Sequence, residues 1–218
     1  MNPGKFVGYT PLTRDLMRLK RSYHSCTDEQ LLKHIASGRD AAFAELYERH
    51  ATRFLRYFFR LLNQDEARAH DLVQDWCIRI VDNAHRFDPS QKFLTWAYTI
   101  AGNLVKNEYR SRTVRRIMTV TDDPAKWGEP MQEWKDSLDR TAFREALQRV
   151  VQEELSDAQR EVFLLRFQED LQLKEIAQIV GCSDGTVKSR LFYALKKLSV
   201  ALAAFHPCPE SLSRGINR

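Results

Sequence analysis

A row of polar and aromatic side chains recurs along one side of a helix that the sequence predicts over residues 93–111. At 100° per residue, these side chains fall opposite the apolar stripe of the same helix. They are Lys92, Trp96, Thr99, Asn103, Lys106 and Arg110. A ring on which a base can stack, flanked by cations that follow the phosphates, is suited to single-stranded nucleic acid. The competing interpretation is that a neighbouring helix covers Trp96.

A second candidate site lies in the last third of the chain, where the pattern is typical of a helix-turn-helix. A two-turn helix is predicted over residues 173–180, a turn at Gly181, and a final helix over about residues 185–202. The predicted inward side of the final helix comprises Val187, Leu191, Ala194, Leu195 and Leu198. The side chains predicted to face DNA are Lys188, Ser189, Phe192, Tyr193 and Lys196. Exposed polar and aromatic groups at the start of a second helix suit reading of the major groove, and a helical hairpin without DNA is the alternative.

Residue types that support metal or nucleotide chemistry are present, but their spacing does not fit it. His50, His70 and His85 form no HExxH or comparable motif, and the four cysteines form no CxxC pair. The eight glycines form no phosphate-binding loop. We therefore predict no catalytic residue, no metal and no cofactor. A metal-dependent hydrolase that uses these histidines is a weaker alternative.

The elements that carry these residues are predicted to be helical nearly throughout, so the fold class is all-α. Thr27 and Gln30 form a capping box at the start of a short helix. A further helix has inward pairs four residues apart, namely Leu72/Val73, Trp76/Cys77 and Ile80/Val81. A loop follows within residues 83–92, because Asp88 precedes Pro89 and the residue before a proline is disfavoured in a helix.

The charge distribution divides the 218 residues into segments. Residues 1–24 carry five Lys and Arg against one acid and form a basic extension. Residues 25–113 and 140–206 are predicted as two small helical domains, joined by a flexible linker over 114–139 in which acids predominate, and residues 207–218 form a tail. The pI near 9.1 permits nucleic-acid binding. Since the chain shows neither a secretory signal nor an apolar stretch of membrane-spanning length, we expect a cytoplasmic protein without membrane insertion.

Taken together, these features resemble the extracytoplasmic-function (ECF) group of the bacterial sigma-70 family of RNA polymerase sigma factors. The stretches that carry the resemblance are Phe43–His50, Asp71–Asp75, Phe93–Leu104, Ala158–Arg166, Glu175–Ala177 and Gly185–Leu191. They span residues 27–113 and 140–203, which is most of the chain. The helix-turn-helix alone is moderately specific, whereas both blocks in this order are highly specific.

The resemblance implies that the first domain binds core polymerase and helps to melt the −10 element of the promoter. Residues implied to contact −10 DNA, some around a base extruded from the duplex, are Asn83, Arg86, Phe87, Lys92, Trp96, Asn103 and Arg110. Residues implied to contact the β′ clamp helices of polymerase are Asp71, Leu72, Val73, Gln74 and Asp75. Of these, Leu72 and Val73 begin the inward stripe described above.

The resemblance implies that the second domain reads the −35 element as duplex and meets the β flap of polymerase. Residues implied to contact −35 DNA are Arg166, Lys188, Ser189, Phe192, Tyr193 and Lys196. Lys197 is expected to meet phosphate together with Lys196. Tyr193 stands where many members of the family have a basic residue. The implied partners are core RNA polymerase and promoter DNA, and an anti-sigma factor is left open as a further partner.

The main alternative is a LuxR-type transcriptional regulator, because residues 156–198 have a similar helix-turn-helix cadence. Such a regulator needs a sensor or receiver block upstream. The upstream block here shows no strand alternation and no βα pattern, which favours the sigma-factor interpretation.

Overall fold

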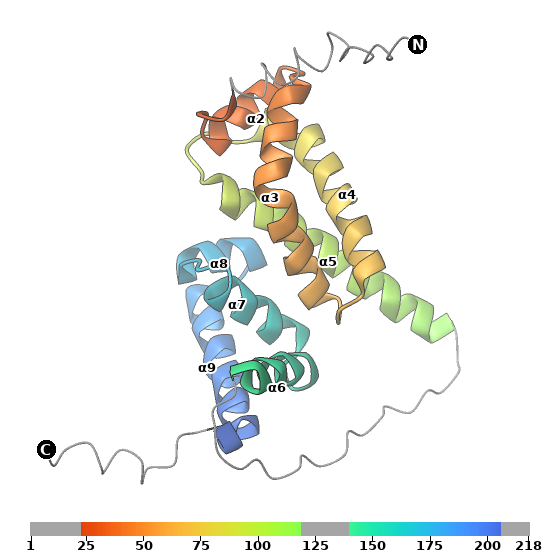
Figure 1. Cartoon of the computed structure of the whole chain (residues 1–218), viewed down its shortest axis with the longest axis vertical. Helices are drawn as coiled ribbons and strands as arrows, with labels where there is room; N and C mark the ends of the chain where they lie inside the picture. Colours follow the sequence, from red (N-terminus) through yellow and green to blue (C-terminus); the bar gives the residue numbers. More distant parts are fainter. Residues whose placement is uncertain (1–22, 119–139, 206–218) are drawn as a thin grey trace, which may run out of the picture. The chain divides into compact units, whose positions relative to one another are not determined.

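The computed structural model describes residues 23–118 and 140–205, and these residues form helices joined by short turns without a β-strand (Figure 1). The predicted all-α fold class is therefore confirmed for the described part of the chain. The chain divides into two compact units, the first of which ends at Glu108. Residues 1–22, 119–139 and 206–218 lie outside the description, and so do most of the predicted extension, linker and tail.

The first unit is built from α2 (Asp28–Ala36), α3 (Asp40–Leu61), α4 (Glu66–Asn83), the short 3₁₀ helix η1 (Ala84–Arg86) and the part of α5 (Phe93–Met118) up to Glu108. Helices α3 and α4 form an antiparallel hairpin, and α5 crosses behind it (Figure 1). The predicted capping box opens α2: Gln30 N donates to Thr27 Oγ1, and Thr27 N donates to Gln30 Oε1. Asp65 caps α4 by accepting a hydrogen bond from Arg68 N at 3.0 Å.

Aromatic side chains form the core of the first unit. Trp76 of α4 stacks on Phe54 of α3 with ring centroids 4.1 Å apart, and Tyr98 of α5 lies 4.7 Å from the same Phe54 ring. All three side chains are fully buried. Rings of this size account for much of the apolar area that a small helical unit removes from water. The core therefore joins α3, α4 and α5 at one point.

Two details of the first unit differ from the predictions. Val81 is 44% exposed, although its pairing with Ile80 predicted an inward position. Helix α5 continues to Met118, seven residues beyond the predicted end at Ser111 and into the predicted linker. The physical reason is that residues 112–118 contain neither glycine nor proline, so nothing in their sequence ends the helix.

The second unit is built from α6 (Arg140–Glu153), α7 (Asp157–Phe167), α8 (Leu173–Val180), α9 (Asp184–Ala201) and η2 (Ala203–Phe205). Arg160 of α7 is buried and donates to the carbonyl oxygens of Val151, Gln152 and Leu155 at 3.2, 2.6 and 3.2 Å. These carbonyls lie at and just beyond the C-terminal end of α6, where helix carbonyls lack intrahelical partners and favour a cation. Arg160 thus fastens α6 to α7.

The predicted helix-turn-helix is confirmed in α8 and α9. Gly181 ends α8 in the left-handed conformation with φ +71°, and Ser183 Oγ caps α9 by accepting from Thr186 N at 3.2 Å. Ala177 and Val187 are both buried where the two helices meet. Leu195 is 45% exposed, so its predicted inward position is wrong. Leu202, one turn beyond Leu198, is buried instead.

No helix in the described ranges contains a segment both long and apolar enough to span a bilayer.

Candidate nucleic-acid and polymerase interfaces

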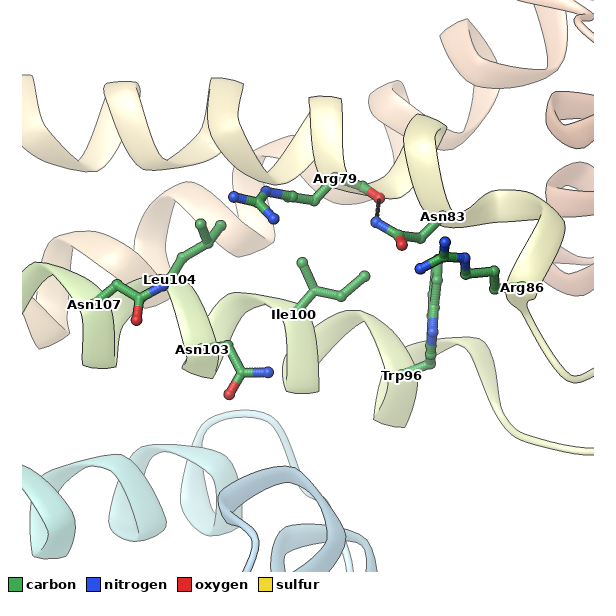
Figure 2. Close-up of a pocket in the computed structure, with 8 residues that line it drawn as sticks. All are labelled: Arg79, Asn83, Arg86, Trp96, Ile100, Asn103, Leu104 and Asn107. Atoms are coloured by element: carbon green, nitrogen blue, oxygen red, sulfur yellow. Dashed lines mark hydrogen bonds between the residues drawn. The ribbon is translucent and has the colours of Figure 1, made fainter.

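A pocket of about 320 Å³ opens between α4 and α5 in the first unit (Figure 2). Its walls carry two guanidinium groups, three carboxamides, one indole and two aliphatic side chains. The lining residues are Arg79, Asn83, Arg86, Trp96, Ile100, Asn103, Leu104 and Asn107. Such a wall offers a planar surface for stacking and hydrogen-bond groups of both kinds.

Each side of the pocket comes from a different element. Arg79 and Asn83 are one turn apart at the end of α4, Arg86 comes from η1, and Trp96 and Asn103 lie on α5 (Figure 2). The side-chain nitrogen of Asn83 donates to the Arg79 carbonyl at 2.8 Å, which fixes the orientation of the amide. Its oxygen stays available as an acceptor. Arg79 and Arg86 give this side of the unit a positive character.

Four of the seven residues predicted to contact −10 DNA meet in this pocket, namely Asn83, Arg86, Trp96 and Asn103. Phe87 is not among the lining residues: it is 8% exposed, and its ring meets the edge of Trp96 with centroids 5.2 Å apart. Phe87 therefore supports Trp96 and does not face a ligand in the pocket. Lys92, just before α5, and Arg110 on α5 are exposed outside the pocket.

The sequence prediction missed the other four lining residues, Arg79, Ile100, Leu104 and Asn107. A periodic signal was available for the α5 residues, because positions 96, 100, 103 and 107 follow the same helical face as Trp96 and Asn103. Arg79 precedes Asn83 by one turn, but its relevance depends on how α4 packs against α5. That packing cannot be read from the spacing alone.

The loop between η1 and α5 is shaped by local hydrogen bonds. Asp88 Oδ1 accepts from Ser90 N at 2.9 Å, and Asp88 Oδ2 accepts from Ser90 Oγ at 2.8 Å. The bond from the Ser90 main chain, followed by the one from its hydroxyl, lowers the pKa of Asp88 below its ordinary value. Asp88 thus forms an Asx-type turn in the loop that leads into α5.

The five residues predicted to contact polymerase divide into two groups in the structure. Leu72 and Val73 are 2% and 6% exposed and belong to the core of the unit. Asp71, Gln74 and Asp75 are exposed on the outer side of α4. The two buried residues can support a contact surface but do not form it.

The exposed side of α4 continues beyond the predicted residues. Ile78 and Val81 are 57% and 44% exposed, so two apolar side chains extend the acidic and amide group of Asp71, Gln74 and Asp75. An apolar centre beside charged groups is typical of a protein-binding surface. We call Asp71, Gln74, Asp75, Ile78 and Val81 the outer face of α4.

At its N-terminal end, the outer face of α4 is tied to α5 by ionic contacts. Arg68 donates to Asp71 Oδ2 at 3.1 Å and to Glu108 Oε2 at 2.5 Å. The hydrogen bond to buried Glu108 is the main cause that raises the pKa of Arg68 above its ordinary value.

The second unit presents five of the six predicted −35 residues on α9, and the sixth, Arg166, lies on α7. Lys188, Ser189 and Lys196 are exposed, and Phe192 and Tyr193 are 63% and 54% exposed. The rings of Phe192 and Tyr193 meet edge to face, with centroids 5.5 Å apart. The start of α9 therefore offers a mixed polar and aromatic surface on which no other described element packs closely.

Two cations of the second unit have structural partners. Arg166 Nη1 donates to the Leu171 carbonyl at 3.0 Å and braces the turn that leads into α8. Lys197 Nζ donates to the Glu154 carbonyl at 2.6 Å, just past the end of α6. In the free protein the Lys197 ammonium group closes the end of α6, and the expectation that Lys197 meets phosphate stays a prediction. Lys196, one residue earlier, points to a different side of α9.

No group of three or more His, Cys, Asp or Glu side chains within residues 23–118 and 140–205 is arranged to hold a metal ion.

Comparison with known proteins identifies both units. The family model described as sigma-70 region 2 matches residues 46–115, and the model described as sigma-70, region 4 matches residues 144–198. The ECF RNA polymerase sigma factor SigL of Mycobacterium tuberculosis is 32% identical over 172 residues, which cover 77% of this chain and 92% of SigL. The ECF RNA polymerase sigma factor EcfG of Rhodopseudomonas palustris is 33% identical over 148 residues, which cover 68% of this chain and 78% of EcfG.

A solved structure agrees with these relatives. The structure of CnrH in complex with the cytosolic domain of CnrY has a TM-score of 0.57 and 26% sequence identity, and the match covers 81% of this chain and 97% of the solved one.

The chain belongs to the sigma-70 family of RNA polymerase sigma factors, and within that family to the ECF group. It is a transcription initiation factor that directs polymerase to promoters, and its partners are core RNA polymerase and promoter DNA. Neither the LuxR-type regulator nor the metal-dependent enzyme finds support in these comparisons.

Proposed function

We propose that the pocket between α4 and α5 receives a base that is extruded from the −10 element when the promoter opens. The observation that carries this proposal is the convergence of Asn83, Arg86, Trp96 and Asn103, from three elements, on one pocket. The periodicity of residues 93–111 indicated Trp96 and Asn103, and the family resemblance implied Asn83 and Arg86 together with them. Their convergence on one pocket is better support than any one of these residues alone.

The chemistry of the pocket fits a nucleobase. Removing a base from the duplex costs a few kcal/mol, which the protein must offset by contacts to the extruded base. Stacking on an aromatic ring returns about 1–3 kcal/mol per base, and Trp96 provides a ring in the wall. The carboxamides of Asn83 and Asn103 can donate and accept at the edge of a base, and Arg86 can attract the adjoining phosphate.

Exposed cations at the start of α5 and along it extend this site into a path for the opened strand. Lys92 lies just before the first residue of α5, Arg110 lies further along the helix, and Asn103 is between them in the sequence. Phosphate contacts of this kind position a strand but carry little sequence information. In our proposal the pocket reads a base, and these cations hold the backbone.

We further propose a division of tasks between the domains. Residues 25–113 hold the −10 element and bind the β′ clamp helices through the outer face of α4, whereas residues 140–206 read the −35 element through α9 and meet the β flap. Residues 114–139 connect the two. The exposed apolar groups Ile78 and Val81 support the polymerase contact, and the exposed side of α9 supports the contact with duplex DNA.

We also propose that a protein partner regulates this chain. CnrH, which is similar to this chain, was solved in complex with the cytosolic domain of CnrY. We propose that an anti-sigma factor binds this chain, that it competes with core polymerase, and that both act in the cytoplasm. The apolar part of the outer face of α4 is a surface that such a competitor would need to cover.

Permanganate footprinting of the −10 region tests the pocket. Reactive thymines are counted at limiting concentrations of holoenzyme formed with the wild type, with Trp96→Ala and with the control Tyr47→Ala, which removes an exposed aromatic ring from α3 outside the pocket lining. Loss of one stacking contact is expected to lower thymine reactivity about fivefold or more for Trp96→Ala alone, while the affinity for core polymerase is unchanged. Equal reactivity in all three holoenzymes would overturn the proposal.

A further inference from the structure

The first main-chain amide of α5 is capped by a residue from far away in the sequence. Phe93 N donates to Glu29 Oε1 of α2 at 3.0 Å, across 64 residues. The residue before the helix is Lys92, whose side chain has only donors and so cannot accept from a helix N-terminus. Because the N-terminus of a helix carries unsatisfied donors and a partial positive charge, a carboxylate is the favoured partner there. Glu29 supplies what the local sequence lacks.

The neighbouring residue fixes α2 so that Glu29 is held at this point. Asp28 accepts from Arg49 Nη1 of α3 at 2.9 Å and lies 2.8 Å from Nε2 of His50. The imidazole of His50 packs on the ring of Phe93 with centroids 4.9 Å apart. Asp28 and Glu29 therefore join α2 to both α3 and the start of α5.

These contacts lie directly behind the pocket. Phe93 precedes Trp96 by one turn, and their ring centroids are 6.5 Å apart. Helix α2 also packs against η1, the element that carries Arg86. A single short helix thus touches both structures that present Trp96 and Arg86 to the pocket. This helix ends before residue 46, where the match to the region 2 family model begins.

We infer that Glu29 is a positioning residue for the −10 pocket: by capping α5 it sets where Trp96 stands when a base enters. This inference rests on the proposed function of the pocket. It adds that α2 acts in promoter opening through the start of α5, without contact between Glu29 and DNA. Loss of the cap lets the first turn of α5 fray, and Trp96 lies in that turn.

The test uses full-length protein assembled with saturating core polymerase on promoters in which 2-aminopurine replaces each −10 base in turn. Extrusion of the substituted base raises its fluorescence. The variants are Glu29→Ala and Glu29→Gln, and the matched control is Asp65→Ala, which removes the cap of α4 in the same unit. Unfolding of each free protein by urea shows the general loss of stability.

We expect Glu29→Ala to lower the equilibrium amount of extruded base by about three- to thirtyfold, the range that loss of a helix cap corresponds to. Glu29→Gln keeps an acceptor oxygen and should recover part of the signal. Asp65→Ala should lower stability by a similar amount without this loss of extrusion. The double variant Glu29→Ala/Trp96→Ala should lose little more than Trp96→Ala alone, because both changes act on the same contact.

The outcomes separate the inference from the proposal beneath it. If Trp96→Ala extrudes the base normally, the pocket assignment fails and the inference fails with it. If Trp96→Ala is impaired while Glu29→Ala matches Asp65→Ala in extrusion, the inference alone is overturned. Full additivity in the double variant would also overturn it, since Glu29 would then act elsewhere.

Discussion

The indole nitrogen of Trp76 donates a hydrogen bond to the main-chain carbonyl of Ala97, 3.2 Å away, so a buried side chain of α4 is bonded to the backbone of α5. Ala97 follows Trp96 directly, and Trp76 lies one turn before Arg79. The bond therefore fixes the distance between the two helices at the place where the pocket opens between them. A buried donor that loses its partner is costly, which makes this contact specific for one packing of α4 on α5.

Trp76→Phe should lower the free energy of unfolding of the first unit by about 1–3 kcal/mol, because the ring is smaller and the N–H donor is lost. The measurement is amide hydrogen exchange of α4 and α5 peptides in the full-length protein, with α8 and α9 as an internal reference. Trp96→Phe makes the same chemical change at a half-buried position and should alter protection by less than about 0.5 kcal/mol. Equal effects of the two variants would contradict the role given to Trp76.

Low pH should destabilise the first unit through two carboxylates. Burial by itself raises the pKa of Asp28, but the hydrogen bonds and charges of His50 and Arg49 outweigh it and hold that pKa below 3.8. Burial also raises the pKa of Glu45, but the hydrogen bonds and charges of Arg49 and His24 outweigh this effect and hold that pKa below its ordinary value. A depressed pKa in the folded state contributes stability above the ordinary value, and this contribution is lost as the pH falls through the folded-state pKa.

The free energy of unfolding should therefore decline as the pH is lowered from about 5 to about 2, with Asp28 and Glu45 contributing to the slope together with Asp88, whose pKa is also lowered. In Asp28→Asn the slope should be shallower, and the difference in stability from the wild type should shrink toward the acidic end. Urea unfolding at a series of pH values measures this slope. Parallel curves for the two proteins would show that Asp28 does not cause the dependence.

The sequence predicted the helices, the helix-turn-helix and most of the exposed polar rows because these features depend on local spacing. The capping box of Thr27 and Gln30 and the turn at Gly181 are examples, since a cap and a left-handed turn are set by residue type within a few positions. Glu29 could not be found in this way. Its partner is 64 residues away, and only the packing of α2 against the start of α5 brings the two together.

The errors in the predicted core have a common origin. Val81 and Leu195 each stand beside another apolar residue in a helix, and periodicity alone cannot say which of two neighbours points inward. When a helix packs against its neighbours on one side, the middle of its apolar stripe is buried and the residues at the margins of the stripe stay exposed. Local spacing also cannot predict the hydrogen bond of Lys197, because its partner, the Glu154 carbonyl at the end of α6, is 43 residues away.

Charge reversal on the outer face of α4 should weaken the complex with core polymerase. Asp75→Lys places a cation beside Ile78 and Val81 and should lower affinity about tenfold, which corresponds to about 1.4 kcal/mol. Competition for core polymerase against a labelled sigma factor measures this, with Asp40→Lys as the same reversal on an exposed residue of α3. If both variants compete as well as the wild type, the outer face of α4 is not the polymerase contact.

The two glycines around the turn of the helix-turn-helix should respond in opposite directions to alanine. Gly181 has φ +71°, and a Cβ there would meet no atom within 4 Å, so Gly181→Ala suffers backbone strain alone, about 1–2 kcal/mol. Gly185 is helical, and its Cβ would be 3.8 Å from Ser183 Oγ, an ordinary contact, so Gly185→Ala should stabilise by up to about 1 kcal/mol. Urea unfolding of the free protein compares the two. Equal shifts of the same sign would refute this account of the turn.

Exposed residues of α9 should separate into those that read bases and one that binds phosphate. Lys188 and Ser189 lie at the start of α9, where side chains can reach base edges, and a good bidentate contact discriminates by about 1–3 kcal/mol. Alanine at either position should change which −35 sequences the holoenzyme uses in a promoter library. Lys196→Ala should instead weaken all promoters together and reduce the salt dependence of binding by about one phosphate contact.

Lys197→Ala is the matched control for Lys196→Ala, because Lys197 is bonded to the Glu154 carbonyl at 2.6 Å. It should lower the stability of the second unit by about 0.5–1.5 kcal/mol and leave the salt dependence unchanged. The free protein should bind duplex promoter weakly, since α9 alone offers a small contact area. The assignment of α9 to −35 reading within the holoenzyme fails if the free protein discriminates full promoters as strongly as the holoenzyme does, since that is the behaviour of a repressor or an activator.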